Sequence, residues 1–73
     1  MSFKETRELE LLPKEIEALE LRQSELTTKM SAADYHRVGA EQMKADRLEA
    51  DRIEKELERK FERWTELESR KGG

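Results

Sequence analysis

Two stretches of the 73-residue chain carry apolar residues at alternating steps of three and four. The first seam consists of Leu9, Leu12, Ile16, Leu19, Gln23, Leu26 and Met30. The second seam consists of Met43, Asp46, Ala50, Ile53, Leu57, Lys60, Trp64 and Leu67. This spacing places one narrow apolar stripe along a helix, and the stripe must be buried against another helix. We therefore predict two long helices that pack on each other through the two seams.

A short connector separates the seams, with the sequence Ser-Ala-Ala-Asp-Tyr-His-Arg-Val-Gly over residues 31–39. Gly39 favours a turn or a helix stop, and Ser31 and Asp34 are both helix N-cap types. Two similar helices joined by a short connector close antiparallel. The predicted fold is an all-α, antiparallel two-helix coiled-coil hairpin that forms a single domain over residues 1–73.

Pro13 sets the predicted start of the first long helix. A proline inside a helix costs about 3 kcal/mol, whereas at the first helical position its missing N–H has no partner to lose. We therefore expect a helix to begin at Pro13, preceded by a short, separate helical turn. The expected segments are a leading segment over 2–12, a helix over about 13–31, a connector over about 31–40 and a helix over about 40–70.

The aromatic residues have predicted packing roles. If the hairpin closes in register, Leu9 and Leu12 pack against Trp64 and Leu67 at its open end. Phe61 lies beside Trp64 and is expected to widen the same apolar face, so both aromatic residues are predicted to belong to the core.

Tyr35 and His36 lie in the connector, and each has two possible roles. Tyr35 could stack on a nucleic-acid base, or it could pack at the tip of the hairpin, which we favour. His36 is isolated, so a solvated or locally hydrogen-bonded side chain is expected rather than a metal ligand or a catalyst.

Composition excludes several other classes of protein. The chain has no cysteine and one histidine, so disulfide staples and a zinc module are not expected. No apolar run approaches the roughly 18 residues of a membrane span, and no signal-peptide pattern is present. We expect a cytoplasmic protein without membrane contact. A two-helix hairpin has no interior volume for an active site, so we expect no catalytic residue, cofactor or metal.

Basic residues form a stripe on the outer face of the second predicted helix. At about 100° per residue they fall within a band about 100° wide, and the band runs about 28 Å along the helix. The candidate nucleic-acid-binding residues are Lys44, Arg52, Lys55, Arg59 and Arg63. Such a band could follow several phosphates of a nucleic-acid backbone.

The same stripe is also compatible with an ordinary solvated coiled-coil face. The acidic residues Glu41, Glu62 and Glu66 fall within it, and the chain has a net charge of -3, which repels nucleic acid at long range. Several opposite charges also stand four residues apart, where they can pair within the helix. These pairs are Asp51–Lys55, Glu56–Lys60 and Glu66–Arg70.

Both ends of the chain resemble a known family. The run Ser-Phe-Lys-Glu-Thr-Arg-Glu-Leu-Glu-Leu-Leu-Pro over residues 2–13, continued by Ile-Glu-Ala-Leu-Glu over 16–20, is similar to the start of the C-terminal domain of Uup-type ABC-F ATPases. The run Phe-Glu-Arg-Trp-Thr-Glu-Leu-Glu over 61–68 resembles the closing motif of that domain. Phe3 replaces the tyrosine typical of the family, and Ala33-Asp34 stands where Asp-Pro is common.

The resemblance implies a context that the spacing does not show. Two ATP-binding cassettes would lie upstream, and they rather than this chain would bind ATP and magnesium. The family domain is an antiparallel coiled-coil hairpin to which DNA binding is attributed, and related proteins act on ribosomes. We therefore expect a non-catalytic DNA-binding module, for which RNA and the ribosome are possible further partners. The contact residues rest on the basic stripe alone.

Two alternatives remain open. The hairpin could be a structural or protein-interaction coiled coil that positions its own ATPase cassettes or docks on the ribosome. The seams could also join two chains, with Gln23, Asp46 and Lys60 fixing the register, although we expect a monomeric hairpin.

Overall fold

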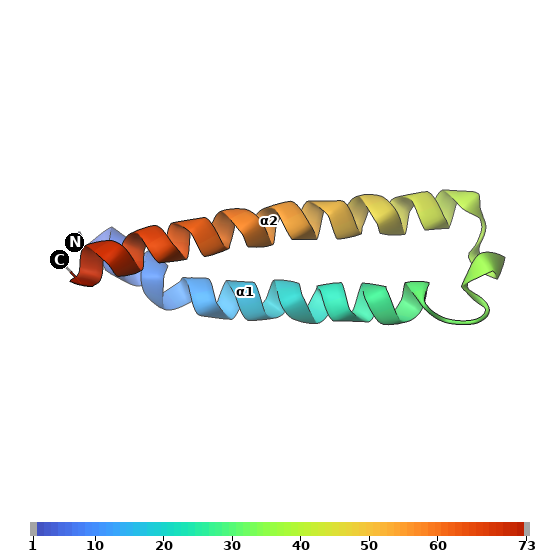
Figure 1. Cartoon of the computed structure of the whole chain (residues 1–73), viewed down its shortest axis with the longest axis horizontal. Coiled ribbons are helices and arrows are strands. Elements are labelled where there is room, and N and C mark those ends of the chain that lie inside the picture. The colour runs from blue at the N-terminus through green and yellow to red at the C-terminus, as the bar shows by residue number, and fades with distance from the viewer. Residues whose placement is uncertain (1, 73) are drawn as a thin grey trace.

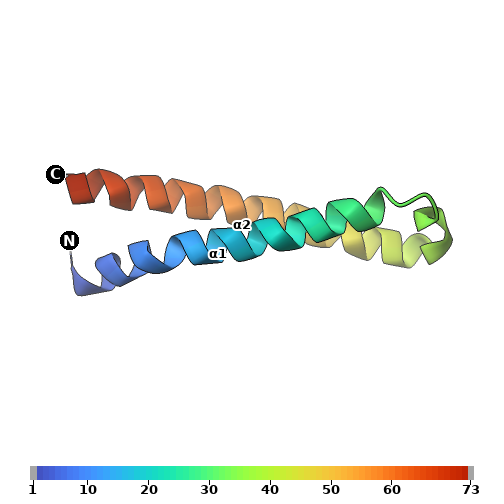
Figure 2. The same cartoon turned by 90° about the horizontal axis from the view of Figure 1, so that it is seen from below.

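The computed structural model describes residues 2–72 and contains two long antiparallel helices (Figure 1). Helix α1 spans Phe3–Met30 and helix α2 spans Ala40–Gly72, with a short 3₁₀ helix, η1, over Tyr35–Val38 between them. The hairpin is 52 Å long and 16 Å wide. The predicted all-α hairpin is confirmed, and the helices cross in the perpendicular view (Figure 2). Met1 and Gly73, the ends of the predicted domain, lie outside the described residues.

The start of α1 differs from the sequence prediction. The helix runs without interruption from Phe3 through Pro13, so the prediction of a helix start at Pro13 and a separate leading turn is wrong. A capping box fixes the true start: the Ser2 hydroxyl accepts a hydrogen bond from the Glu5 backbone N–H at 3.2 Å, and the Glu5 carboxylate accepts one from the Ser2 N–H. This arrangement satisfies two N–H groups that would otherwise lack a partner.

Pro13 is accommodated within α1 because the residues before it are packed. Its ring removes the N–H that would bond the Leu9 carbonyl, a local loss within an otherwise continuous helix. Leu9 and Leu12, which precede it, are buried together with Leu67 of α2 in one cluster. This packing confirms the expected contact of Leu9 and Leu12 with Leu67 and keeps the leading turns helical.

The connector turns the chain through η1 and Gly39. Gly39 has a φ of +94°, a backbone conformation that residues with a Cβ rarely adopt, and the Met43 N–H then bonds its carbonyl at 3.1 Å to begin α2. The expected connector over 31–40 and second helix from residue 40 agree with these boundaries. The two chain ends therefore meet at one end of the molecule, with η1 at the other (Figure 1).

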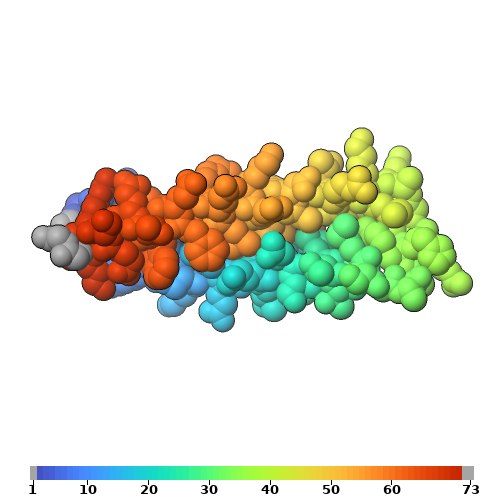
Figure 3. Space-filling view, viewed as in Figure 1, coloured from blue at the N-terminus to red at the C-terminus, as the bar shows by residue number. Residues whose placement is uncertain are grey.

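The core consists of the two seams in contact. One cluster contains buried Ile16, Leu26, Ile53 and Leu57, and the other contains the three leucines of the open end. In the space-filling view the side chains of α2, orange to yellow, rest on those of α1 along the molecule (Figure 3).

The two aromatic residues of the second seam are not fully buried. Phe61 is 43% exposed and Trp64 is 37% exposed, so the prediction that both belong to the core is wrong. Phe61 stands at the flank of the seam rather than in it, and tryptophan is too large to be covered completely by one facing helix. Together with Pro13 and Ile16 they line a shallow apolar groove.

Candidate nucleic-acid interface

One edge of the hairpin carries the ion pairs between the helices. Arg22 donates two hydrogen bonds to Glu49, at 2.7 and 3.0 Å, and Arg63 donates two to Glu8, at 2.8 and 3.0 Å. In each seam, successive residues are assigned alternately to heptad positions a and d, beginning with a. In this notation all four paired residues occupy position g, directly before a position a. Antiparallel helices bring their g positions together on one side. We call this side the paired edge.

Two further pairs extend the paired edge. Lys60 lies 3.5 Å from Glu15, and Arg70 pairs with Glu5 near the open end. Arg70 also donates to Glu66, at 2.7 Å, within α2. Of the three pairs predicted within α2, Glu66–Arg70 is the one that forms among residues 2–72. Lys60 pairs with Glu15 of α1 instead of Glu56, and no ion pair joins Asp51 and Lys55 in that range.

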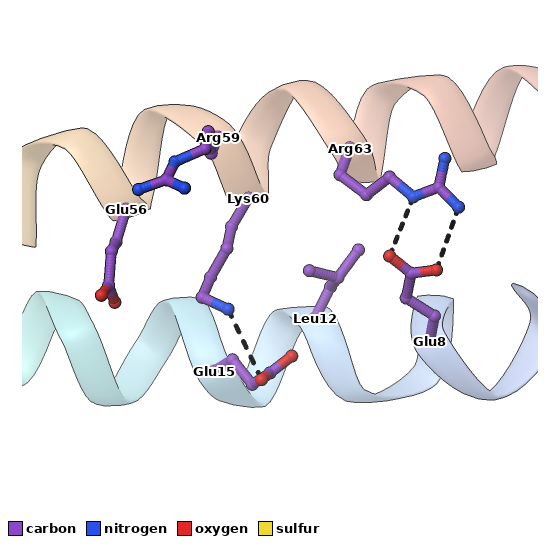
Figure 4. Close-up of a pocket in the computed structure, with 7 residues that line it drawn as sticks. All are labelled: Glu8, Leu12, Glu15, Glu56, Arg59, Lys60 and Arg63. Carbon is purple, nitrogen blue, oxygen red and sulfur yellow. Dashed lines mark hydrogen bonds and ion pairs between the residues drawn. The ribbon is translucent and has the colours of Figure 1, made fainter.

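An open groove of about 600 Å³ follows the paired edge. Its lining is formed by Glu8, Leu12, Glu15, Glu56, Arg59, Lys60 and Arg63. Figure 4 shows the Arg63–Glu8 and Lys60–Glu15 pairs bridging the helices, with the Arg59 side chain directed along α2 towards Glu56. The bridging charges in this groove stabilise the contact between the helices.

The charge state of the paired edge follows from these bonds. The hydrogen bonds from Arg63 lower the pKa of Glu8, and those from Arg22 lower the pKa of Glu49. The hydrogen bond from Arg70, followed by that from the Ser2 N–H, lowers the pKa of Glu5. Reciprocally, the bond to Glu8 raises the pKa of Arg63. All these groups are therefore charged at neutral pH.

Arg63 is consequently placed differently from the other candidate residues. The sequence assigns it to the outer basic stripe, whereas the structure places it half-buried between the helices with Glu8 and Glu66 as partners. The deviation arises because a coiled coil repeats every 3.5 residues, which turns Arg63 towards the partner helix relative to a straight helix.

The side chains of the remaining four candidate residues are free to contact a ligand. Lys44, Arg52, Lys55 and Arg59 are all exposed, and none forms an ion pair with another residue in the range 2–72. Arg52 and Arg59 lean towards the paired edge, since both occupy position c. We call these four residues the free basic stripe.

The Tyr35 side chain is packed at the tip of the hairpin. Its ring is buried, and its hydroxyl donates a hydrogen bond of 2.9 Å to Asp46. The packing interpretation of Tyr35 is confirmed, and a base-stacking role with an exposed ring is not compatible with this arrangement. His36, in η1, is exposed.

Asp46 accepts hydrogen bonds from three side chains although it occupies an apolar seam position. Gln42 donates at 2.9 Å and Lys29 at 3.3 Å, in addition to Tyr35. Burial acts to raise the pKa of Asp46, but the three hydrogen bonds outweigh it and keep the pKa below its ordinary value. The carboxylate is therefore charged and fully partnered.

These interhelical contacts were not predicted from the sequence. The signal for the paired edge was present, because the residues directly before the a positions carry opposite charges on the two helices. Pairing them across an antiparallel register predicts Arg22–Glu49 and Arg63–Glu8. The Tyr35–Asp46 bond had no comparable signal, because it depends on how η1 turns the connector.

Comparison with known proteins places the hairpin in a family. The family model described as "ABC transporter C-terminal domain" matches residues 1–69. The chain belongs to this family. Among curated proteins, the ATP-binding protein Uup of Escherichia coli (strain K12) is 38% identical over all 73 residues. Those residues are the whole of this chain but 12% of that relative, so this ABC transporter C-terminal domain spans about one eighth of the protein it resembles.

Two further findings concern this C-terminal domain. No solved structure matched the chain. Within residues 2–72, neither helix is both long enough and apolar enough to cross a membrane.

Proposed function

We propose that this ABC transporter C-terminal domain binds nucleic acid, foremost DNA, through the phosphate backbone. The observation that carries the proposal is the free basic stripe of Lys44, Arg52, Lys55 and Arg59. These side chains are exposed and without an ion pair among residues 2–72, whereas Arg22, Arg63 and Arg70 are occupied by interhelical carboxylates. The stripe extends from Lys44 to Arg59 of α2, about 22 Å, which matches several phosphates along one strand.

The expected binding is weak and sequence-independent. The free basic stripe offers side chains that contact phosphates but no element that fits a groove and reads base edges. The net charge of -3 opposes approach at long range. Affinity should therefore fall steeply with salt, since each phosphate contact releases a counterion.

The test is a titration of the 73-residue chain with duplex DNA and with structured RNA, followed by residue-resolved NMR shifts at two salt concentrations. We expect shifts at Lys44, Arg52, Lys55 and Arg59 that disappear at high salt. The variant Arg52→Glu/Lys55→Glu/Arg59→Glu should lose most of the binding. A matched variant with the same change of charge on α1, Lys4→Glu/Arg7→Glu/Lys14→Glu, should retain more of it. Equal loss in the two variants would reduce the effect to net charge and remove the stripe assignment.

A second candidate function is a scaffold or protein-docking arm. Both chain ends lie at one end of a hairpin 52 Å long, so the tip extends far from any domain joined at the base (Figure 1). Such an arm would position upstream ATP-binding cassettes, which would carry the ATP and magnesium chemistry, or dock on the ribosome in the cytoplasm. Absence of NMR shifts with both nucleic acids would favour this function. A single, concentration-independent monomer mass would support the hairpin over pairing between two chains.

A further inference from the structure

The edge opposite the paired edge combines an apolar groove with unpaired carboxylates. Beside the seam residues that border it, this edge consists of heptad positions e and b, on the other side of the seams from position g. The groove is lined by Pro13, Ile16, Phe61 and Trp64 and has a volume of about 200 Å³. Phe61 and Trp64 leave 43% and 37% of their surface exposed there.

The groove is too small for a drug-sized ligand, whose pockets measure about 300–1,000 Å³. Its lining is almost entirely apolar, and it lies between two helices. A shallow groove of this kind fits one or two anchoring side chains of a partner helix, as in helix-in-groove recognition.

The charges around the groove define the partner. The exposed carboxylates at positions e and b are Glu10, Glu17, Glu20, Asp51, Glu54, Glu58 and Glu68. None of them forms an ion pair with another residue in the described range 2–72, in contrast to the carboxylates of the paired edge. The cations at these positions, Lys44 and Arg47, lie four or more helical turns from Trp64, near the tip. We call this surface the acidic edge.

We infer that the acidic edge is a docking surface for a basic amphipathic helix of a partner protein. An apolar side chain of that helix occupies the groove beside Phe61 and Trp64, and its flanking lysines or arginines face the carboxylates. Lys44 is the one residue of the free basic stripe that stands on this edge, and it lies near the tip, away from the groove. The inference does not depend on nucleic-acid binding.

The carboxylates of the acidic edge would repel the other possible partners. A nucleic-acid backbone or an anionic membrane surface would face unpaired carboxylates with like charge. A symmetric dimer through this edge would bring the same carboxylates of two copies together. A cationic partner is the one that turns the surrounding charge into attraction and specificity.

Trp64 provides the measurement, because it is the only tryptophan of the chain and forms part of the groove. The probe is a designed 21-residue peptide without tryptophan, with leucines at helical spacing on one face and lysines on the other. Docking removes water from the exposed indole, so we expect a saturable blue shift of its emission at one peptide per chain. A peptide of the same composition in scrambled order, which cannot present an apolar face, should bind much more weakly.

Two double variants distinguish an effect of the acidic edge on peptide binding from an effect of overall charge. Glu54→Gln/Glu58→Gln removes two carboxylates beside the groove and should weaken peptide binding about fivefold. Glu41→Gln/Glu62→Gln removes the same charge from exposed positions on the outer face of α2 and should change the affinity less than twofold. Phe61→Ala should weaken binding while leaving the helical circular dichroism spectrum unchanged.

The possible results are decisive. Preference for the amphipathic peptide, together with selective loss in Glu54→Gln/Glu58→Gln, supports the docking surface. Absence of a blue shift, equal binding of the scrambled peptide, or equal loss in the two double variants overturns it. A blue shift that grows with protein concentration alone, accompanied by a dimer mass, would assign the groove to a second copy and also overturn it.

Discussion

Asp46 is a charged residue in an apolar seam, and its three hydrogen-bond donors explain how it is tolerated. An unpaired buried carboxylate is strongly destabilising, whereas one with satisfied oxygens fixes the arrangement of its partners. Lys29 comes from α1, Tyr35 from η1 and Gln42 from α2. The carboxylate therefore connects all three elements at the tip and holds the connector in its turned conformation.

Substitutions at the tip should show that these residues act together. We expect Tyr35→Phe to lower the Tm by about 5 °C, because the Asp46 oxygen loses a donor that water replaces poorly. Asp46→Ala should lower the Tm further, and the double variant should lose less than the two single changes added together. Thermal unfolding followed by circular dichroism measures this cycle. Strict additivity would show that the hydrogen bond does not couple the two residues.

Acid should destabilise the hairpin through four carboxylates. The pKa values of Glu5, Glu8, Asp46 and Glu49 are lower in the folded chain than their ordinary values of 4.5, or 3.8 for aspartate. The unfolded chain therefore binds more protons as the pH falls, so the stabilisation is fully present above about pH 5 and is lost as the pH falls through the folded pKa values.

The measurement of this acid effect is the Tm at pH 7, 5 and 3. We expect little change between the first two values and a clear fall at the third. The variant Glu8→Gln/Glu49→Gln should have a lower Tm at pH 7 and a smaller fall at pH 3. An equal fall in the variant would place the acid effect in other groups.

At the scale of elements, α1 shows how local signals compete. Ser2 and Glu5 form the Ser-x-x-Glu pattern of a capping box, which was sufficient to predict a helix start at Phe3. The cost of an internal proline argued for a start at Pro13 instead. The structure resolves the conflict through tertiary contact, because Leu9 and Leu12 are buried against Leu67 and this burial offsets the lost hydrogen bond.

Pro13→Ala tests that account. Alanine restores the N–H to the Leu9 carbonyl and has a much higher helix propensity, so we expect a gain of up to about 3 kcal/mol in the free energy of unfolding. Urea denaturation measures the gain, and protection of the amide at residue 13 from hydrogen exchange confirms the restored bond. A loss of stability would mean that the proline geometry is needed to bring Leu9 and Leu12 onto Leu67.

The sequence predicts the helices, the seams and the turn better than the exposure of residues at the border of a seam. The steps of three and four identified both seams, and Gly39 identified the turn, because each depends on short-range geometry. Arg63 and Trp64 were misplaced because small angular differences decide whether a residue at the border of a seam faces the partner helix or solvent. The four cations of the free basic stripe were placed correctly on the exposed surface, since they stand farther from the seam.

At the scale of the whole molecule, the core is divided along the length of the hairpin. Leu26 belongs to the larger cluster and Leu67 to the cluster of the open end, and both side chains are almost completely buried. Each change to alanine should cost about 2–5 kcal/mol through lost burial and the cavity left behind.

The two changes should differ in where the chain opens. Leu67→Ala removes support from the open end alone, so hydrogen exchange should accelerate most near the chain ends while residues around Ile53 stay protected. Leu26→Ala should accelerate exchange along both helices. Exchange measured by NMR distinguishes the two patterns, and uniform acceleration in Leu67→Ala would show that the hairpin unfolds as one unit.

The order of the contacts along the hairpin also bears on how it folds. The paired residues are separated by 11 positions for Tyr35 and Asp46, 27 for Arg22 and Glu49, 55 for Arg63 and Glu8, and 65 for Arg70 and Glu5. Closing a loop of 65 residues costs about 1.6 kcal/mol more than closing one of 11, but once the tip has formed each later pair closes only a small additional loop. We therefore expect the chain to fold as a zipper that nucleates at η1 and advances towards the base. The contacts of Glu5 and Glu8 at the base would then form last, when almost all of the hairpin is already in place.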